Sequence, residues 1–287
     1  MNTILKMEGI YKSFGGVHAL VDVKLDVAKG EVHALLGENG AGKSTLMNVL
    51  TGVIPMDKGR IEFDGTVYPQ PTIRQMEDAG IAFVHQELSV INDLTVYENI
   101  FLNREIRNKW HVLDKKQMIA KTQDLFARLG VNMDPMTMVS ELKTSEKQLL
   151  EICRALHANA KLLILDEPVA NLDPISRDAV WHLLDEWRHE THGTAIVCSH
   201  VLAEMDEWAT DYAIIDCGQV LKAGKNPGAG AAPIASATHF EMEFASLVAR
   251  EQIENALLAA GLVPTQISAK GETLGEIYRE VINAKIF

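Results

Sequence analysis

The chain has 287 residues, of which 47% are apolar and 23% charged. This length and composition fit one large globular domain or two smaller ones, and they exclude fibrous and disordered classes. A formal net charge of −12 excludes the chain-wide positive field of a nucleic-acid-binding protein. No apolar stretch approaches the roughly 18 residues of a membrane-spanning helix, and no signal peptide is recognisable. We therefore expect a soluble cytoplasmic chain.

The first part of the chain carries strand patterns. Residues 4–27 alternate loosely between apolar and polar around Gly15 and Gly16, which predicts a hairpin-like strand pair. Val32–Leu36 is a short apolar run directly before a glycine-rich segment, and a helical pattern follows it. Three further runs, 80–84, 162–165 and 194–198, have the length and composition of buried parallel strands. The sequence therefore predicts an α/β fold with a parallel core sheet and an N-terminal antiparallel β segment.

The middle of the chain has a different character. Between residues 88 and 157 no strong strand signal occurs, and the patterns at 117–129 and 146–156 have helical period. We expect a helical subdomain inserted at about 88–157, within a first domain of residues 1–222.

The end of the chain reads as a linker and an appendage. Residues 223–238 are rich in Gly, Ala and Pro, which is typical of a linker. A strand at 239–244 and amphipathic helices at 250–260 and 274–284 predict a small α+β accessory segment over 239–287.

The glycine-rich segment fits the phosphate-loop pattern G-x-x-x-x-G-K-[ST], and it stands between a strand and a helix as that motif requires. Glycines let consecutive backbone N–H groups wrap a polyphosphate, and the helix that opens at Lys43 adds further donors. Lys43 is expected to bridge the β- and γ-phosphates, and Ser44 to ligate Mg²⁺. The predicted ATP-binding residues are Gly37, Glu38, Asn39, Gly40, Ala41, Gly42, Lys43, Ser44 and Thr45.

A second motif carries two carboxylates. The apolar run at 162–165 ends in Asp166, Glu167 and Pro168, which places acids at the mouth of a parallel sheet. We expect Asp166 to hold the Mg²⁺ shell and Glu167 to orient and polarise the attacking water. The plainer alternative is a solvated Asp-Glu turn.

With these motifs in this order, the chain resembles the ATP-binding subunit of an ABC transporter over residues 6–221. The resemblance implies a P-loop NTPase core with a RecA-like parallel sheet. It also implies that ATP and Mg²⁺ are the cofactors and that the chain is an ATPase.

The resemblance assigns roles to four further residues. Gln86 would contact Mg²⁺ and sense the transmembrane partner, and His200 would contact the γ-phosphate; both are expected to serve catalysis beside Glu167. Asp173 matches the D-loop. Phe14 is the expected adenine stacker, with Tyr11 in the same segment as its rival.

The chain departs from the family at the signature segment, where L-S-G-G-Q is replaced by L-K-T-S-E-K-Q at residues 142–148. We expect Ser145 and Gln148 to form a capping box, so that the helix start still faces a phosphate. By the resemblance, Lys143, Thr144 and Ser145 act on the partner's nucleotide. A merely solvated polar helix start is the alternative.

Residues 37–106 are similar to ATPases of bacterial monosaccharide importers of the ribose/galactose type, a likeness that covers about the first 160 residues. This likeness implies that the chain powers sugar import. The implied partners are transmembrane permease subunits, a second cassette that is either a copy of this chain or an unlike one, and a solute-binding protein. The implied location is the inner face of the cell membrane. Residues 169–174 and 274–278 instead resemble single-cassette exporters of drugs or peptides.

Two other classes are less favoured. A soluble cassette ATPase that acts on chromosomes or ribosomes usually has a coiled-coil insertion, zinc cysteines or a second cassette, and none is present; no nucleic-acid partner is expected. A regulatory module without hydrolysis would have lost Glu167 or His200, and both are present.

Overall fold

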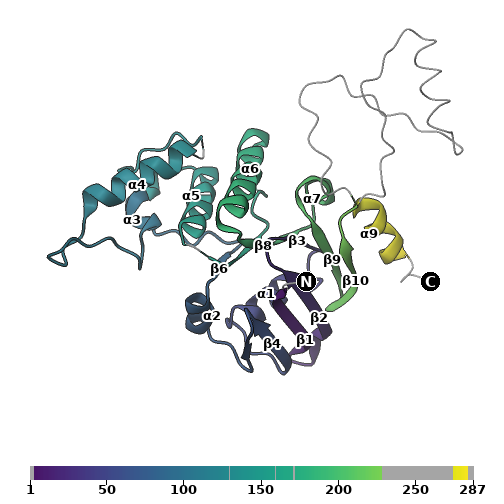
Figure 1. Ribbon diagram of the computed structural model, residues 1–287. Coiled ribbons are helices and arrows are strands. Elements are labelled where there is room, and N and C mark those ends of the chain that lie inside the picture. The colour runs from purple at the N-terminus through teal and green to yellow at the C-terminus, as the bar shows by residue number, and fades with distance from the viewer. Residues whose placement is uncertain (1–2, 129, 159, 171, 228–273, 284–287) are drawn as a thin grey trace, which may run out of the picture.

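The computed structural model describes residues 3–227 and 274–283, apart from 129, 159 and 171 (Figure 1). The strand expected at 239–244 and the helix expected at 250–260 lie outside the described residues. Within the described residues, no helix has the length and apolar character needed to cross a membrane.

The N-terminal strands form the antiparallel segment that the sequence predicts. Gly15 and Gly16 both have positive φ, at 52° and 90°, which suits the tight turn between two 12-residue strands. The sheet has the order β2-β1-β4-β5. Its strands are β1 (Thr3–Phe14), β2 (Val17–Ala28), β4 (Lys58–Phe63) and β5 (Thr66–Tyr68).

The second sheet has six strands in the order β10-β9-β3-β8-β7-β6. The pairs that join β6, β7, β8, β3 and β9 are all parallel, and β10 is antiparallel at the edge. The strands are β3 (Val32–Leu36), β6 (Ile81–Val84), β7 (Leu162–Asp166), β8 (Thr194–Ser199), β9 (Asp211–Asp216) and β10 (Gln219–Lys225). The parallel strands predicted from apolar runs are confirmed.

Those runs are continuous because both faces of the sheet are covered. Successive residues of a strand point to opposite faces, so Ala34 and Leu36 pack in one cluster while Leu35 packs in the other. The Leu35 cluster includes Leu46 and Met47, so helix α1 (Lys43–Leu50) lies between the two sheets. The opposite cluster takes residues of α5 (Thr144–His157), α6 (Pro174–Thr191) and α7 (Leu202–Trp208).

A helical layer stands to one side of the six-stranded sheet (Figure 1). Helices α4 and α5 fall on the two helical patterns predicted from the sequence. The short helices α2 and α3 lie where the sequence shows no clear helical pattern. The bounds are α2 (Ile73–Ala79), α3 (Val96–Ile100), α4 (Lys115–Arg128) and a 3₁₀ turn, η1 (Val139–Glu141).

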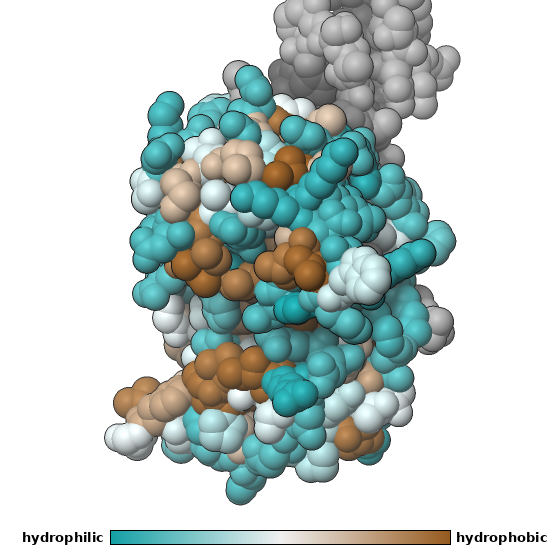
Figure 2. Space-filling model, turned by 90° about the vertical axis from the view of Figure 1, so that its left-hand side faces the viewer, coloured by the Kyte–Doolittle hydropathy of each residue, from teal (hydrophilic) through white to brown (hydrophobic). Residues whose placement is uncertain are grey.

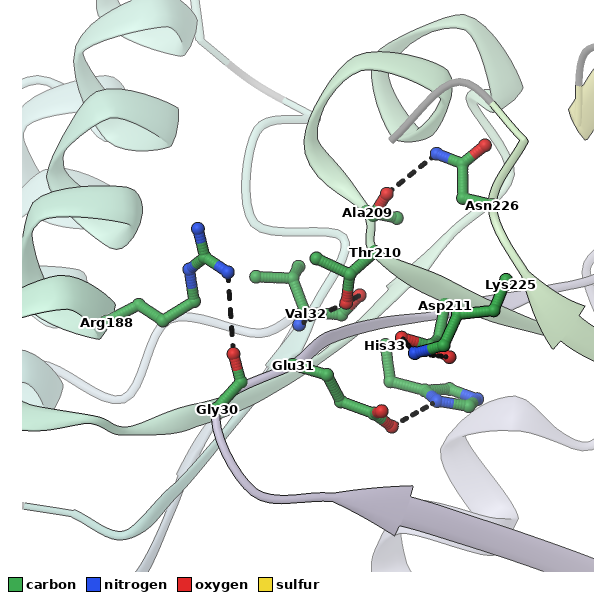
Figure 3. A network of polar contacts seen from close by, with 10 residues as sticks. All are labelled: Gly30, Glu31, Val32, His33, Arg188, Ala209, Thr210, Asp211, Lys225 and Asn226. Carbon is green, nitrogen blue, oxygen red and sulfur yellow. Dashed lines mark hydrogen bonds and ion pairs between the residues drawn. The ribbon is translucent and has the colours of Figure 1, made fainter. Parts of the chain in front are cut away.

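The predicted linker begins too early. Strand β10 continues to Lys225, whose ammonium lies 2.8 Å from the Asp211 carboxylate of β9. The next residue, Asn226, is 4% exposed and donates to the carbonyls of Met205 and Asp206. It also donates to the carbonyl of Ala209 at 2.7 Å (Figure 3). Because strand pairing and buried hydrogen bonds extend to this point, the ordered domain reaches at least Asn226 rather than residue 222.

The same network holds the strand that leads to the phosphate loop (Figure 3). The N–H of Val32 donates to Thr210 Oγ1 at 3.0 Å, and Arg188 of α6 reaches the carbonyl of Gly30. Buried Glu31 and His33 pair at 2.9 Å between Oε1 and Nδ1. These contacts fix the N-terminal end of β3, at the opposite end from the phosphate loop.

The last predicted helix is present as α9 (Leu274–Asn283). Its residues Leu274 and Ile277 are 0% and 2% exposed and belong to the core cluster that α7 also lines. The backbone N–H of Leu274 donates to the carboxylate of Asp206 on α7. This helix is therefore packed on the α/β domain.

Candidate functional site

The phosphate loop wraps around the side chain of Lys43. The ammonium donates to the carbonyls of Gly37 at 2.6 Å and Glu38 at 3.2 Å. A Cβ at Gly37 would lie 2.4 Å from the carbonyl oxygen of Ile215, so no larger residue fits there. Gly42 has φ of 110°, which an L side chain rarely adopts. The loop therefore requires glycine for close packing and for backbone conformation.

A hydroxyl and a carboxylate meet beside this loop. Ser44 at the start of α1 donates from Oγ to Oδ2 of Asp166 at 2.7 Å, although 122 residues separate the two. Asp166 ends β7 and is 5% exposed. Mg²⁺ prefers hard oxygen ligands such as hydroxyls and carboxylates, so this pair fits the ion that the sequence analysis expects.

The next carboxylate is held in an unusual conformation. Glu167 has φ of 51°, a left-handed value that costs free energy for a residue other than glycine. The Glu167 N–H donates to the Cys198 carbonyl at 3.0 Å, and Oε1 lies 2.8 Å from Nδ1 of His200. Side-chain exposure is 8% for Glu167 and 53% for His200. The surrounding strands therefore hold a strained, nearly buried carboxylate against an imidazole.

These groups line one cavity of about 340 Å³. The lining residues are Ala19, Glu38, Asn39, Gly40, Gly42, Lys43, Ser44, Thr45, Gln86, Asp166 and Glu167. All but Ala19 were singled out from the sequence. Ala19 lies on β2, and a Cβ at Gly218 would approach its carbonyl oxygen to 2.3 Å. An alanine in a strand gives no sequence signal of such a position.

Three predicted residues stand behind or beside the cavity. Gly37 and the buried Ala41 shape the loop without lining the cavity, and His200 reaches it through Glu167. Each of them acts on the geometry of a lining residue.

The two aromatic candidates for adenine stacking differ in exposure. Phe14 is 47% exposed at the end of β1, with the Lys12 ammonium 5.3 Å from its ring centroid. Tyr11 is partly buried, and the ammonium of Lys58 lies 5.9 Å from its ring. Phe14 presents the freer ring face, and its stacking role stays a prediction.

The capping box expected at the signature segment is wrong. Helix α5 starts at Thr144 with Lys143 as its N-cap, and the Lys143 N–H donates to Oε2 of Glu146 at 2.7 Å. The Gln148 side chain instead donates to the carbonyl of Pro168 at 2.7 Å. The helix begins before Ser145, so Glu146 stands at the third helical position and takes the capping role. Lys143, Thr144 and Ser145 do not line the cavity of this chain.

Asp173 has a structural role that the sequence did not reveal. It is the N-cap of α6, where Oδ1 accepts from the N–H of Ser176 at 3.1 Å and Oδ2 from its hydroxyl at 2.6 Å. Its expected D-loop function is a separate property and stays a prediction.

One residue near the site was missed. Burial raises the pKa of Tyr278 on α9, the negative charges of Glu38 and Asp216 add to the rise, and a hydrogen bond with the backbone of Glu38 opposes it. Tyr278 therefore lies against the first turn of the phosphate loop. Residues 228–273 separate it from the domain in sequence, so no local pattern indicates this contact.

Comparison with known proteins places these features in a family. Residues 20–170 match the ABC transporter family. The chain is 44% identical over 206 residues to ribose import ATP-binding protein RbsA 2 of Burkholderia cenocepacia (strain HI2424), which is 71% of this chain and 40% of that protein. It is 43% identical over 221 residues to L-arabinose transport ATP-binding protein AraG of Geobacillus stearothermophilus, 76% of this chain and 43% of that protein. The chain thus spans about two fifths of the length of these relatives.

A solved structure shows the same fold. The ADP conformation of MJ1267, an ATP-binding cassette of an ABC transporter, superimposes with a TM-score of 0.68 at 28% identity, covering 78% of this chain and 92% of that one. The P-loop NTPase architecture expected from the sequence is therefore confirmed. Since the family match covers more than half of the chain and agrees with the motifs and the fold, this protein belongs to the ABC transporter family.

Proposed function

We propose that this chain binds ATP with Mg²⁺ and hydrolyses it to drive transport across a membrane. The observation that carries the proposal is the convergence of Lys43, Ser44, Asp166 and Glu167, from two segments far apart in sequence, on one cavity beside a loop of backbone N–H groups. A bound Mg²⁺ ion supplies charge that neutralises the phosphates. The hydroxyl of Ser44 and the carboxylate of Asp166 are the groups that would hold it.

Each remaining group has a task that follows from its placement. The Lys43 ammonium sits inside the loop and gives up its carbonyl partners for phosphate oxygens, which are stronger acceptors because they are charged. Glu167 accepts a hydrogen bond from water and polarises it for attack. His200 keeps that carboxylate in one orientation through the 2.8 Å contact. Gln86 reaches the same cavity from the end of β6.

Sugar is the transported class that the relatives favour. Two proteins named for ribose import and L-arabinose transport share 43–44% identity with most of this chain. The exporter alternative rests on two short segments, 169–174 and 274–278, and has no comparable support. We infer that the chain powers the import of a monosaccharide across the membrane of a bacterial cell.

Such a system requires partners. We infer permease subunits in the membrane, a second cassette that is a copy of this chain or an unlike one, and a solute-binding protein outside. A groove of about 510 Å³ between the sheet and the helical layer offers a place for a permease segment, and its lining includes His85, Leu102 and Arg154. The chain would then work at the inner face of the membrane.

Phosphate release from Mg-ATP by the purified full-length chain tests the enzymatic proposal. We expect turnover that requires Mg²⁺ and that Ser44→Ala reduces, because the hydroxyl ligand is lost. The matched control is Thr51→Ala, just after the same helix. The buried Thr51 hydroxyl donates to the carbonyl of Met47. Turnover that is equal with and without Mg²⁺, or equal in Ser44→Ala, contradicts the assignment.

Uptake of labelled sugar by cells tests the transport proposal. Deletion of the gene should abolish uptake of one pentose or hexose, and the wild-type gene should restore it while a Glu167→Gln copy should not. Unchanged sugar uptake combined with loss of drug or peptide efflux would favour the exporter alternative.

A further inference from the structure

One tryptophan lies fully in solvent, away from the site described above. Trp110 is 85% exposed, and Val112 and Leu113 close after it are 60% and 49% exposed. In contrast, Trp181 and Trp187 are 3% and 5% exposed. The exposed group belongs to the segment 104–116, which leaves the helical layer after α3 and returns as α4 begins. An exposed apolar cluster of this kind normally marks a surface that another body covers.

The tip of this segment is built to present those side chains. The Asn108 side-chain oxygen accepts from the N–H groups of Trp110 at 2.9 Å and Val112 at 3.1 Å, and the Asn108 N–H donates to the carbonyl of Val112 at 2.8 Å. Arg107 and Leu113 form an antiparallel bridge at the base. Because the backbone is already ordered, docking through the tip loses little conformational entropy.

The segment is basic in an acidic chain. It carries five Lys or Arg residues and two acidic ones, a formal net charge of +3, whereas the whole chain has −12. The five cations are Arg104, Arg107, Lys109, Lys115 and Lys116. All five are exposed, and none forms an ion pair with a carboxylate of the residues that the structure describes. Arg107 also donates to the carbonyl of His111, and the Lys115 ammonium lies 5.5 Å from the ring centroid of Tyr97. Neither contact neutralises the charge, so the segment keeps a positive charge toward an anionic surface.

The surroundings of the segment also indicate a docking surface. Figure 2 views the helical end of the molecule and shows apolar patches set among hydrophilic side chains. Arg104, the first residue of the segment, and Leu102 and Asn103 just before it line the 510 Å³ groove that we assign to the permease. If a permease segment enters that groove, the neighbouring tip faces the same membrane.

We propose that segment 104–116 docks directly on the anionic surface of the lipid bilayer, with Trp110 at the headgroup level and the cations Arg107, Lys109, Lys115 and Lys116 against lipid phosphates. This inference rests on the proposed function at a membrane. Tryptophan is enriched at membrane interfaces, and clustered Lys and Arg residues recognise anionic lipid. The tip presents three apolar side chains, only one of them aromatic, among clustered Lys and Arg residues. Because charged residues, and Lys in particular, are depleted from the cores of protein interfaces, the bilayer fits this surface better than a protein does.

The fluorescence of Trp110 reports directly on docking. The full-length wild-type chain is titrated with vesicles of phosphatidylcholine alone or with phosphatidylglycerol, while tryptophan emission and co-sedimentation are followed. We expect a blue shift and binding only with phosphatidylglycerol, and weakening by salt because exposed charges are screened. Trp110→Ala, an exposed position, should lose the blue shift while the melting temperature stays the same.

Variants that remove positive charge provide a second test of vesicle binding. Lys109→Gln combined with Lys116→Gln should lower the vesicle partition coefficient about 25-fold, since each cation near the surface contributes about fivefold. Lys24→Gln, at a lysine whose side chain is 72% exposed on β2, should leave it nearly unchanged.

Three outcomes overturn the proposal. Wild-type chain that binds no phosphatidylglycerol vesicle at low salt refutes it, as does equal weakening by Lys24→Gln, which would show unspecific charge. Binding that needs permease subunits in the vesicle would assign the tip to a protein instead. Mg-ATP turnover of the same preparation separates the two ideas: active enzyme without lipid binding rejects this inference alone, whereas inactive enzyme rejects the proposed function.

Discussion

His200 Nδ1 lies 2.8 Å from Glu167 Oε1, just beyond the carboxyl ends of the adjacent strands β7 and β8. The register of these parallel strands places Asp166 beside Cys198, and the Glu167 N–H donates to the carbonyl of Cys198. Two residues that are 33 positions apart in sequence are thus brought together by strand pairing. This pairing gives the nearly buried carboxylate a fixed direction.

Replacing that carboxylate should separate binding from hydrolysis. Glu167→Gln retains an oxygen that accepts from water but loses the negative charge and the basicity, so we expect turnover to fall by about 10²- to 10⁴-fold. Nucleotide affinity measured by calorimetry should be unchanged. Glu8→Gln, at an exposed carboxylate on β1, is the control and should keep full turnover. Near-normal turnover of Glu167→Gln would reject its assigned role.

Lys43→Ala should weaken nucleotide binding by about 10- to 100-fold, the equivalent of a charged hydrogen bond of about 1.5–3 kcal/mol. The physical reason is that phosphate charge is left uncompensated in a partly desolvated loop. Isothermal calorimetry with ATP measures this, and the melting temperature verifies that the variant folds. Lys24→Ala, on an exposed strand position, should bind normally. Unaltered affinity in Lys43→Ala would show that the site lies elsewhere.

Lys143 tests whether cassettes pair across the nucleotide. In the Glu167→Gln background ATP should persist between two subunits and shift them toward a dimer by mass action. Adding Lys143→Ala should weaken that ATP-dependent dimer while ADP affinity of the monomer stays the same. The control is Lys147→Ala, on helix α5, where the lysine ammonium contacts the side chain of Asn92. Light scattering that shows a monomer at every Mg-ATP concentration would point to an unlike cassette as the mate.

Asn226→Ala should destabilise the domain by about 1–3 kcal/mol, because buried carbonyls lose their donor. The amide nitrogen of Asn226 serves the carbonyls of Met205, Asp206 and Ala209. Urea unfolding measures the change, with exposed Gln219→Ala at the start of the preceding strand β10 as control. Nucleotide affinity should persist, since Asn226 does not line the cavity. A change below experimental error would show that the Asn226 hydrogen bonds do not stabilise the domain.

Asp64 should contribute an acid-dependent part of the stability. Hydrogen bonds from the ammonium groups of Lys29 and Lys161 lower the Asp64 pKa from 3.8 to about 2. A lowered folded-state pKa stabilises the protein above about pH 4, and this stability is lost as the pH falls toward 2. Solvent screening of the exposed pairs limits the effect to about 1 kcal/mol or less.

The test of that acid dependence is urea unfolding between pH 2.5 and 5. Asp64→Asn tolerates the left-handed φ of 47° at this turn and removes the charge. Its stability should fall less steeply with acid than that of the wild type, whereas exposed Asp26→Asn should follow the wild type. Parallel curves for wild type and Asp64→Asn would contradict the assigned pairing.

Local chemistry explains why much of the site was predictable. The phosphate loop needs glycine at Gly37 and Gly42 because backbone packing and positive φ leave no room for a side chain, and those needs are met within eight consecutive residues. The run before Asp166 is apolar throughout because its strand is covered on both faces. These requirements fall on consecutive residues, so they appear in the sequence as patterns even where a distant group, such as the carbonyl of Ile215 beside Gly37, imposes them.

Other features are set by partners far along the chain. Gln148 was expected to cap its own helix, but its side chain donates to Pro168, a contact that exists only after α5 packs beside β7. Tyr278 meets Glu38 because α9 returns to the core across 240 residues of sequence separation. Polar side chains have several competing hydrogen-bond partners of similar energy. The sequence by itself therefore determined the α/β class, the phosphate loop and the two acids, while only the tertiary structure decided which distant groups meet, because packing of the whole chain selects among those partners.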